Sequence, residues 1–402
     1  MDVFLSALSL QVGYNAALVA IGAALLGIAS GASGAYLFLR KRALVSDAVA
    51  HASLPGIGLA FLIMVAFGGT GRFLPGLLLG SAVTAGLGLL GIDWITRRTR
   101  LGEDAAIGAV LSVSFGLGIV LLTIIQTMSE GRQAGLESVL LGSTAGMLFS
   151  DAVTIAIGGA LSVLVLILLR RPMTLVAFDS GFAQAQGVNV RATDLAIMGL
   201  VMAVTVTGLL IVGLILIVAL LIIPAVTARF WSDRTDHVVL MAGLFGGLSG
   251  WIGAAISASA PAVPTGPIIV LVAASFFAVS LICAPQRGVF STLVSRARFS
   301  ARVHERQGLL ALARSEPIFD GYTLRILRRG ALIYPDGVAT DLGRGEAARA
   351  LRDEKRWEEA RQIHRDEAVI GQYDGLTAIE NVLTGDEIAE IDRRLGPPQG
   401  VV

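Results

Sequence analysis

The stretch SDAVAHASLPGIGLAF, Ser46–Phe61, decides what kind of protein this chain is. It is an apolar run that carries an aspartate, Asp47, and a histidine, His51, four residues apart. On a helix that spacing places both side chains on one face, one turn apart. An ionisable pair is costly within a membrane, so such a pair marks a transport pathway or a binding site. Imidazole and carboxylate groups together suit a divalent transition metal.

The residues alone leave two interpretations of this pair open. In a structural interpretation, Asp47 or Ser46 caps the helix just after a basic loop, and a buried hydrogen bond explains the pair. Capping does not explain His51, which lies one turn deeper. In a metal-binding interpretation, two ligands are too few for a tight site, but a second subunit across a symmetric interface would supply a mixed set of four. A weak site suits transport, because the ion must leave again.

Four positions are candidates for a gate or hinge, because broken helices near the middle of a membrane often mark transport pathways. Pro55 and Gly56 are expected to interrupt the helix that carries the pair. Gly213, together with Gly208, is expected to break a very long apolar run, and Pro224 lies near the end of that run.

Composition divides the chain into two expected domains. Mean hydropathy is +0.76 and 54% of the 402 residues are hydrophobic, which is far above the usual range for a soluble enzyme. Residues 1–286 carry 13 basic and 12 acidic residues, whereas the much shorter segment 287–402 carries 18 of each. A membrane domain over 1–286 and a water-soluble tail over 287–402 are therefore expected. Cys283 is the only cysteine, which excludes an intramolecular disulfide and a cysteine-based zinc site.

Apolar runs long enough to cross a bilayer predict eight spans, or nine if the long run is counted twice. They lie at roughly 14–38, 44–67, 73–95, 104–126, 150–169, 193–229, 238–258 and 267–284. Eleven basic residues fall in alternate loops, and only Arg72 and Arg132 fall in the others. Because basic loops stay on the cytoplasmic side, the N-terminus is expected outside and the tail in the cytoplasm. Glycines crowd several spans, among them Gly27, Gly31 and Gly34, and predict close helix packing.

A second unusual stretch is FDSGFAQAQGVNV, Phe178–Val190, which lies between two predicted spans on the cytoplasmic side. A short helix is expected over 181–186. It is either an ordinary amphipathic loop or a docking helix that inserts into a cleft of a partner protein, and the residues alone do not decide between them.

Three motif classes are absent from the sequence. It has no GxxxxGK[ST] stretch, and its only lysines are Lys41 and Lys355, so ATP hydrolysis through a P-loop is excluded. Neither G-x-S-x-G nor H-E-x-x-H occurs, so a hydrolase has no motif to support it. The net charge of +1 gives no support for a nucleic-acid partner.

The sequence resembles the permease subunits of ABC importers for zinc, manganese and iron(II), the ABC-3 family. The matching blocks occur in the family's order, namely 46–61, 103–121, 178–189, 212–230 and 264–271. The resemblance implies a type II ABC importer-like, all-α polytopic fold that works as a dimer of itself or with a paralogue. It also implies that Asp47 and His51 bind the transported metal. It makes 178–189 an ATPase-coupling segment, with Phe178, Asp179, Phe182 and Gly187 as contact candidates.

The tail is similar to DtxR-like metal-dependent repressors, most strongly at 352–362 and 373–398. Helices are expected at 302–315, 322–329, 344–365 and 374–395, with a turn and β-wing at 330–343, as in a winged-helix module. At the positions that bind metal in the repressors this chain has Lys355, Glu359, Tyr373, Thr377, Glu380 and Asn381. Only the two glutamates keep ligand chemistry, which argues against metal sensing by the tail and leaves an interaction module or a packing appendage.

The leading hypothesis is therefore a multi-pass permease subunit of the bacterial inner membrane that imports a divalent metal, manganese first and then zinc or iron(II). The resemblance implies no permanently bound cofactor. Its expected partners are a cytoplasmic ABC ATPase that uses ATP, an extracytoplasmic metal-binding protein, a second permease subunit and membrane lipid. The alternatives are a secondary metal/proton symporter, with Asp47 carrying the proton, and a membrane-anchored metal-responsive regulator.

Overall fold

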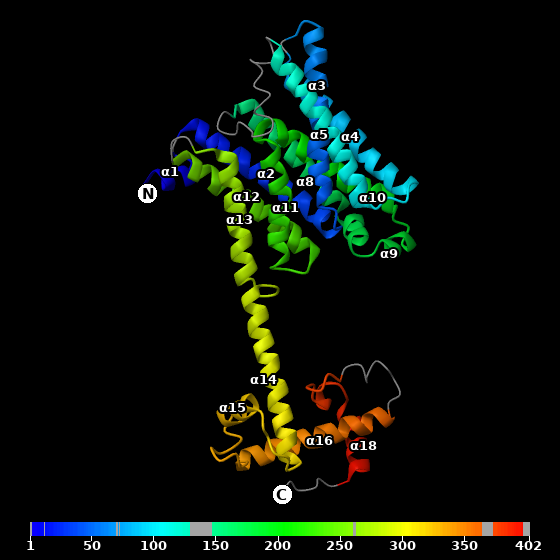
Figure 1. Cartoon of the computed structure of the whole chain (residues 1–402), viewed down its shortest axis with the longest axis vertical. Coiled ribbons are helices and arrows are strands. Elements are labelled where there is room, and N and C mark those ends of the chain that lie inside the picture. The colour runs from blue at the N-terminus through cyan, green and yellow to red at the C-terminus, as the bar shows by residue number, and fades with distance from the viewer. Residues whose placement is uncertain are drawn as a thin grey trace. The chain divides into compact units, whose positions relative to one another are not determined.

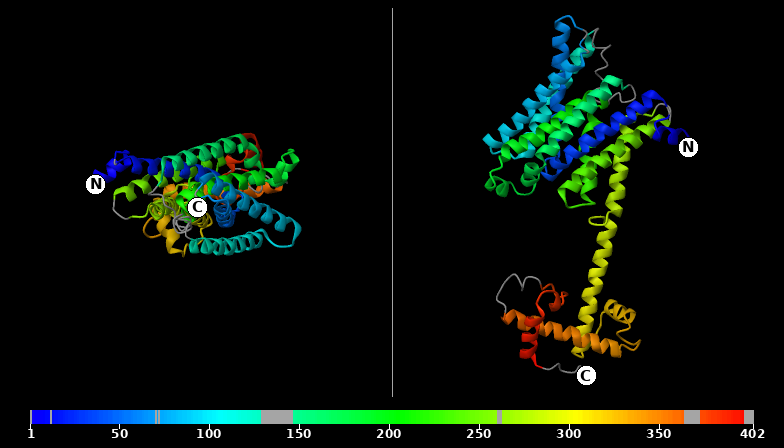
Figure 2. Two further views of the ribbon diagram at one scale, coloured as in Figure 1. Left: turned by 90° about the horizontal axis from the view of Figure 1, so that it is seen from above. Right: turned by 180° about the vertical axis from the view of Figure 1, so that it is seen from behind.

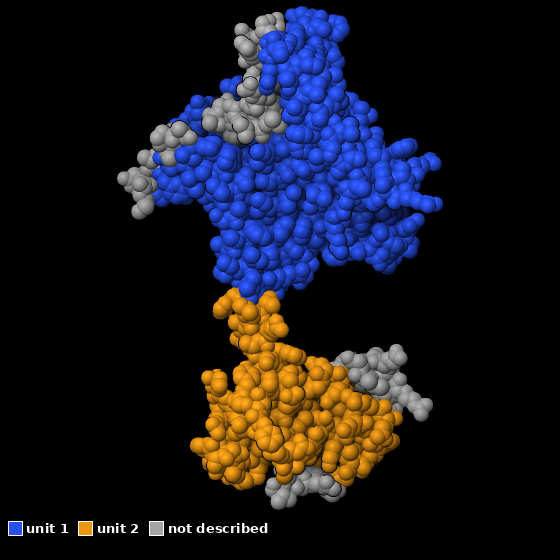
Figure 3. Space-filling view, in the orientation of Figure 1, with its two compact units in different colours: residues 1–289 blue, residues 290–402 orange. Residues whose placement is uncertain are grey.

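The computed structural model describes residues 2–11, 13–69, 71, 73–128, 147–259, 263–363 and 373–396. Over these residues the chain is built from helices (Figure 1) and divides into two compact units, residues 1–289 and 290–402 (Figure 3). The helices of the first unit are α1 (Asp2–Leu8), α2 (Tyr14–Leu39), α3 (Leu44–Ala66), α4 (Leu74–Arg98), α5 (Glu103–Thr127), α8 (Phe149–Phe178), α9 (Ser180–Ala185), α10 (Val190–Val212), α11 (Leu214–Arg229), α12 (Thr235–Ser259) and α13 (Thr265–Cys283).

Eight helices of the described residues are long and apolar enough to span a membrane, namely α2, α3, α4, α5, α8, α10, α12 and α13. Their positions confirm the expected all-α polytopic fold. Two-thirds of the most apolar window of α2 and of α3 is buried within the protein, against 17% of that of α5. Hence α2 and α3 lie at the centre of the bundle, while α5 turns most of its surface outward to where lipid would lie.

Helix α2 packs on α12 through glycines, as the sequence predicts (Figure 2). A Cβ added at Gly27 would strike the backbone carbonyl of Gly246, and one added at Gly31 would strike that of Ala242. A Cβ added at Gly250 of α12 would likewise strike the backbone carbonyl of Ala23 of α2. The two backbones are therefore in direct contact over two helical turns, which only residues without bulky side chains allow.

The break in the long apolar run lies at Gly213, while Gly208, the other expected break, lies inside α10. The backbone of Gly213 has φ 87° and ψ 164°, a conformation that is essentially restricted to glycine. Gly208 of α10 approaches both Leu26 of α2 and Ile217 of α11. Leu221, one turn further along α11, approaches Gly34 of α2. Helix α10 starts beside the C-terminal end of α2, where Arg40 pairs with Asp194. Helix α11 runs back toward that same end, so α10 and α11 form a hairpin.

Several expected cytoplasmic segments meet at one end of the first unit. Arg40, after α2, pairs with Asp194 of α10, and Asp93, near the end of α4, pairs with Arg191 of α10. This arrangement agrees with the alternation of basic loops in the sequence. Arg72 and Arg132, the basic residues of the opposite loops, lie outside the described residues, and the side of the membrane stays a prediction.

The second unit contains α14 (Val289–Ala313), α15 (Gly321–Arg329), α16 (Asp341–Ile363), a 3₁₀ turn (Ile379–Asn381) and α18 (Gly385–Leu395). Between α15 and α16, the described residues form one antiparallel bridge, Ile333 with Ala339, at the place of the expected wing. A winged-helix module therefore stays a prediction. The expected single helix over 374–395 is wrong. Asp374 forms a turn by accepting hydrogen bonds from the backbone of Leu376 and Thr377. A new helix then begins after Thr384, whose backbone N–H and hydroxyl both donate to the Glu387 carboxylate.

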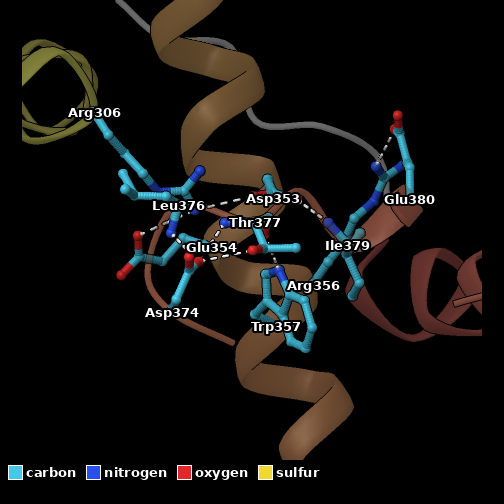
Figure 4. Close-up of polar contacts among 10 residues, drawn as sticks. All are labelled: Arg306, Asp353, Glu354, Arg356, Trp357, Asp374, Leu376, Thr377, Ile379 and Glu380. Atoms are coloured by element: carbon cyan, nitrogen blue, oxygen red, sulfur yellow. Dashed lines mark hydrogen bonds and ion pairs between the residues drawn. The ribbon is translucent and has the colours of Figure 1, made fainter. Parts of the chain in front are cut away.

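Polar side chains hold the C-terminal segments against α16 (Figure 4). Asp353 of α16 pairs with Arg306 of α14 at 2.9 Å and accepts a hydrogen bond from the backbone N–H of Ile379. The indole N–H of Trp357, which is 1% exposed, donates to the carbonyl of Thr377 at 2.9 Å. These bonds tie α14 and the segment after Asp374 to one face of α16.

A bidentate ion pair completes this arrangement. The Arg356 guanidinium donates to both carboxylate oxygens of Asp392 on α18, at 2.8 and 2.6 Å. These bonds hold the pKa of Asp392 below its usual range, and Arg352, which also pairs with Asp392, shifts the pKa in the same direction. The contact joins residues 36 positions apart, so local sequence patterns do not reveal it.

Replacing Gly27 by valine should prevent α2 and α12 from packing. The added atoms strike the backbone of Gly246, so we expect a loss of stability of about 3 kcal/mol, the upper part of the range for overpacking. Gly108→Val is the control, because Gly108 lies on α5 with open space around it. The amount of monodisperse protein extracted in mild detergent measures the effect. Equal yields of the two variants would contradict the packing described here.

The second unit should lose stability in acid through Asp392. Because the folded-state pKa is depressed, this stabilisation is present above the unfolded value of about 3.9 and is lost as pH falls through the folded value. Asp392→Asn should therefore be less stable than wild type near pH 6. As the pH falls below about 4, wild type should lose this stabilisation, so the difference in stability between the two proteins should shrink. Amide hydrogen exchange of α16 and α18 in the full chain, corrected for intrinsic rates, measures both. If the stability of wild type and of Asp392→Asn changed in parallel with pH, the Arg356–Asp392 pair would contribute nothing to the pH dependence.

Candidate functional site

Helix α3 begins without a side-chain cap, so the capping interpretation of Asp47 and Ser46 is wrong. Its N-cap is Ala43, which forms no side-chain cap hydrogen bond. The Ser46 hydroxyl instead donates to the carbonyl of Ala43 at 2.7 Å. Asp47 lies in the first turn of α3, where a carboxylate is favoured by the helix dipole. Its side chain is thus available for another contact.

The structure brings Asp47 and His51 together as the sequence predicts. The His51 Nε2 atom lies 3.5 Å from the Asp47 Oδ1 atom. The His51 side chain is 16% exposed and that of Asp47 is 37% exposed, so the pair opens outward at its carboxylate end. One imidazole nitrogen and one carboxylate therefore converge on a single point at the surface of α3.

An aromatic side chain from α5 orients the histidine. The rings of His51 and Phe115 meet edge to face, with centroids 4.9 Å apart and planes at 82°. The Nδ1 atom of His51 is buried, and it has no hydrogen-bond partner among the described residues. The ring is thus held by packing, and Nε2 is the atom directed at Asp47. Sequence patterns miss Phe115, because it is one of many apolar residues on α5.

Pro55 and Gly56 do not interrupt α3, contrary to expectation, because the helix continues from Leu44 to Ala66. Their effects are local. Proline has no backbone N–H, so the carbonyl oxygen of His51 loses its donor four residues further along the helix. Gly56 lets α3 approach α4, since a Cβ there would strike the carbonyl of Gly80.

The other two hinge candidates lie on different helices. Gly213 forms the turn between α10 and α11. Pro224 is buried and lies inside α11, which continues past it to Arg229. Gly213 therefore ends one helix and begins the next, whereas Pro224 removes a single backbone hydrogen bond from a helix that continues.

The coupling candidates form a separate, exposed feature around α9, a short helix over Ser180–Ala185. The Asp179 carboxylate caps α9 by accepting hydrogen bonds from the backbone of Gly181 and Phe182, both at 2.9 Å. Gly187 has φ +81° and turns the chain toward α10. Phe178 and Phe182 are 64% and 52% exposed. Asp179 and Gly187 thus shape the segment, while the two phenylalanines present apolar surface that a partner could cover.

Among the described residues, no group of three or more His, Cys, Asp or Glu side chains could hold a metal ion. This holds for the second unit too, where Glu380 pairs with Arg356 instead. The Asp47–His51 pair therefore brings together one imidazole and one carboxylate, with no third His, Cys, Asp or Glu side chain grouped with them among the described residues.

Comparison with known proteins places the first unit in a defined group. The ABC 3 transport family matches residues 14–284, which include α2 to α13. The manganese transport system membrane protein MntC of Bacillus subtilis (strain 168) is 42% identical over 299 residues, or 74% of this chain and 67% of that protein. The zinc transport system membrane protein TroC of Treponema pallidum (strain Nichols) is 37% identical over 282 residues, or 70% of this chain and 93% of that protein.

A solved structure shares the fold as well. PsaBC from Streptococcus pneumoniae, in complex with Fab, superimposes with a TM-score of 0.61 at 29% sequence identity. The superposition covers 71% of this chain and 96% of that chain. These similarities confirm the resemblance drawn from the five sequence blocks.

Proposed function

The chain belongs to the ABC 3 transport family, and we propose that it is the membrane-spanning permease subunit of an ATP-driven importer of divalent transition metal ions. Manganese is the first candidate for the transported ion, since the relative with 42% identity is named for manganese transport. Zinc follows, from the relative with 37% identity, and iron(II) from the family resemblance. A nitrogen and oxygen ligand set suits all three metals.

The observation that carries this proposal is the contact between Asp47 and His51 on α3. Both residues lie in a helix long and apolar enough to span the membrane. Charged or ionisable groups in such a helix are costly, so they are kept where an ion or a proton must pass. The pair sits near the end of α3 that follows the basic loop Arg40–Arg42. We assign it to the metal pathway close to the cytoplasmic face.

A second permease subunit completes the site in this proposal. One chain supplies two donors among its described residues, whereas divalent transition metals in proteins take four or more. A symmetric dimer would place two Asp47–His51 pairs across one axis and double the donor set. The partner is a second copy of this chain or a paralogue. Such a shared site forms and opens as the subunits move, which suits release of the ion.

The segment around α9 is the proposed docking point for the ATPase. A short helix with two exposed phenylalanines matches helix-in-groove recognition, in which apolar side chains enter a cleft of the partner. The ATPase supplies ATP hydrolysis, since this chain has no P-loop. An extracytoplasmic metal-binding protein delivers the ion. The tail, residues 287–402, then lies in the cytoplasm as an interaction module.

Loss of either member of the pair should abolish transport. In proteoliposomes that hold the complete importer, Asp47→Ala and His51→Ala should each lower ATP-driven manganese uptake by about a hundredfold. Losing a residue that only orients a metal ligand already costs about ten- to a hundredfold, and loss of a ligand itself should cost no less. Ser53→Ala is the control, because Ser53 is buried on the same helix and, among the described residues, its hydroxyl donates to the carbonyl of Ala50 in its own helix. Wild-type uptake by both site variants would remove the assignment.

The same vesicles separate an ABC importer from a symporter. Uptake should need the ATPase subunit and internal ATP, because the permease alone has no means of hydrolysing ATP. Uptake by the purified permease alone under a proton gradient would contradict the proposal.

Truncation of Phe178 and Phe182 should weaken assembly with the ATPase. Aromatic anchors at the centre of an interface carry much of its affinity, so we expect Phe178→Ala with Phe182→Ala to weaken ATPase binding by about ten- to a hundredfold. Phe67→Ala is the control, since Phe67 is also exposed but follows the opposite end of α3. Co-purification of the two subunits at varied concentration measures the affinity. Equal affinity in the two variants would place the docking surface elsewhere.

A further inference from the structure

An ionic cluster joins the start of α3 to the helices on both sides of α9. Its centre is Asp194, in the second turn of α10, whose side chain is 9% exposed. The Asp194 Oδ2 atom lies 2.9 Å from Arg40 Nη2 and 3.4 Å from Arg42 Nη1. Both arginines belong to the loop between α2 and α3, so one carboxylate holds that loop against α10.

Two further contacts extend the cluster to other helices. Arg42 Nε lies 2.7 Å from Glu103 Oε1 at the start of α5. Arg40 Nη1 donates to the carbonyl of Val176 at 2.8 Å, close to the end of α8. Val176 and Asp194 stand on either side of α9 in the sequence. Any displacement of α9 that shifts the end of α8 or the start of α10 therefore acts on Arg40 and Arg42.

The arginine loop is also the base of the metal-binding helix. Arg42 lies two residues before Leu44, the first residue of α3, and five residues before Asp47. A helix transmits displacement along its axis with little loss, because its turns are hydrogen-bonded to one another. A shift at Arg42 therefore moves the carboxylate of Asp47 and, one turn later, the ring of His51.

The cluster has hydrogen-bonding capacity that this arrangement does not use. The Asp194 Oδ1 and Arg40 Nε atoms are buried and have no hydrogen-bond partner among the described residues. Buried polar atoms are nearly always bonded, and leaving one unbonded is unfavourable. A second arrangement of the same side chains, in which these atoms are bonded, would relieve that cost. Coupling between distant sites requires an element that can adopt two arrangements, and the unbonded atoms make this cluster a candidate for one.

We infer that Asp194, Arg40 and Arg42 are positioning residues that transmit movement of α9 to the Asp47–His51 pair. The inference rests on the proposed function, because it assigns α9 to the ATPase and the pair to the metal. It adds the physical link between them. None of the three residues touches the metal, and none lies on the docking surface of α9.

The test separates ATP hydrolysis from transport in the reconstituted complete importer. Asp194→Asn keeps the shape of the side chain and removes the charge that holds Arg40 and Arg42. We expect manganese uptake to fall about tenfold, within the usual range of coupling between two sites, while ATP hydrolysis and co-purification with the ATPase stay near wild type. The ratio of ATP hydrolysed to metal imported should thus rise about tenfold.

Two further variants keep this test decisive. Arg42→Gln should give the same loss, and the double variant with Asp194→Asn should be no worse than either single one, since both break the same link. Asp93→Asn is the matched control: Asp93 pairs with Arg191 of α10 at 3.0 Å but does not touch the arginine loop before α3. Its uptake should remain close to wild type.

Three outcomes would overturn the inference: an unchanged ratio in Asp194→Asn and Arg42→Gln, additive losses in the double variant, or an equal loss in Asp93→Asn. The last would mean that any loosening of α10 lowers uptake. Failure of the proposed function appears differently, as absence of ATP-driven metal uptake by the wild-type importer itself.

Discussion

The architecture depends on one constraint, which is that an aspartate and a histidine must be kept inside a bundle of apolar helices. Charged groups are tolerated in such a bundle only where they face its interior or a water-filled path. Helix α3, which carries Asp47 and His51, is accordingly among the most buried spans, packed between α4 and α5. Close packing on α4 is made possible by Gly56 and Gly80. Phe115 of α5 then fixes the ring of His51.

A second constraint explains why so many residues of the first unit are small. Packing between helices in lipid lacks the hydrophobic driving force that operates in water, so it depends on close approach. Glycines of α2 and α12 bring two backbones into contact, and Gly213 allows α10 and α11 to fold back on each other. The centre of the bundle is therefore closely packed, and the ion-pair cluster around Asp194 lies at the end where α9 emerges.

Much of this fold could be predicted from sequence, because helices in membranes are set by local patterns. Apolar runs located the eight spans, and the four-residue spacing put Asp47 beside His51. Long-range contacts were not predictable, since no local pattern pairs Arg40 with Asp194 or Arg356 with Asp392. The interruption expected at Pro55 was wrong, because one missing hydrogen bond does not break a helix that its neighbours hold. In the tail, the turn chemistry of Asp374 and Thr384 overrode the expected continuous helix.

In the importer that we propose, Asp47 and His51 from two subunits bind the transported metal. Electron–nuclear double resonance of Mn²⁺ bound to the purified importer, labelled with ¹⁵N-histidine, tests this most directly. We expect coupling to imidazole nitrogen from two histidines per ion. With the protein still assembled, His51→Ala should remove both couplings in a dimer of this chain and one of the two in a dimer with a paralogue. A manganese centre without imidazole coupling, or one unchanged in His51→Ala, would contradict it.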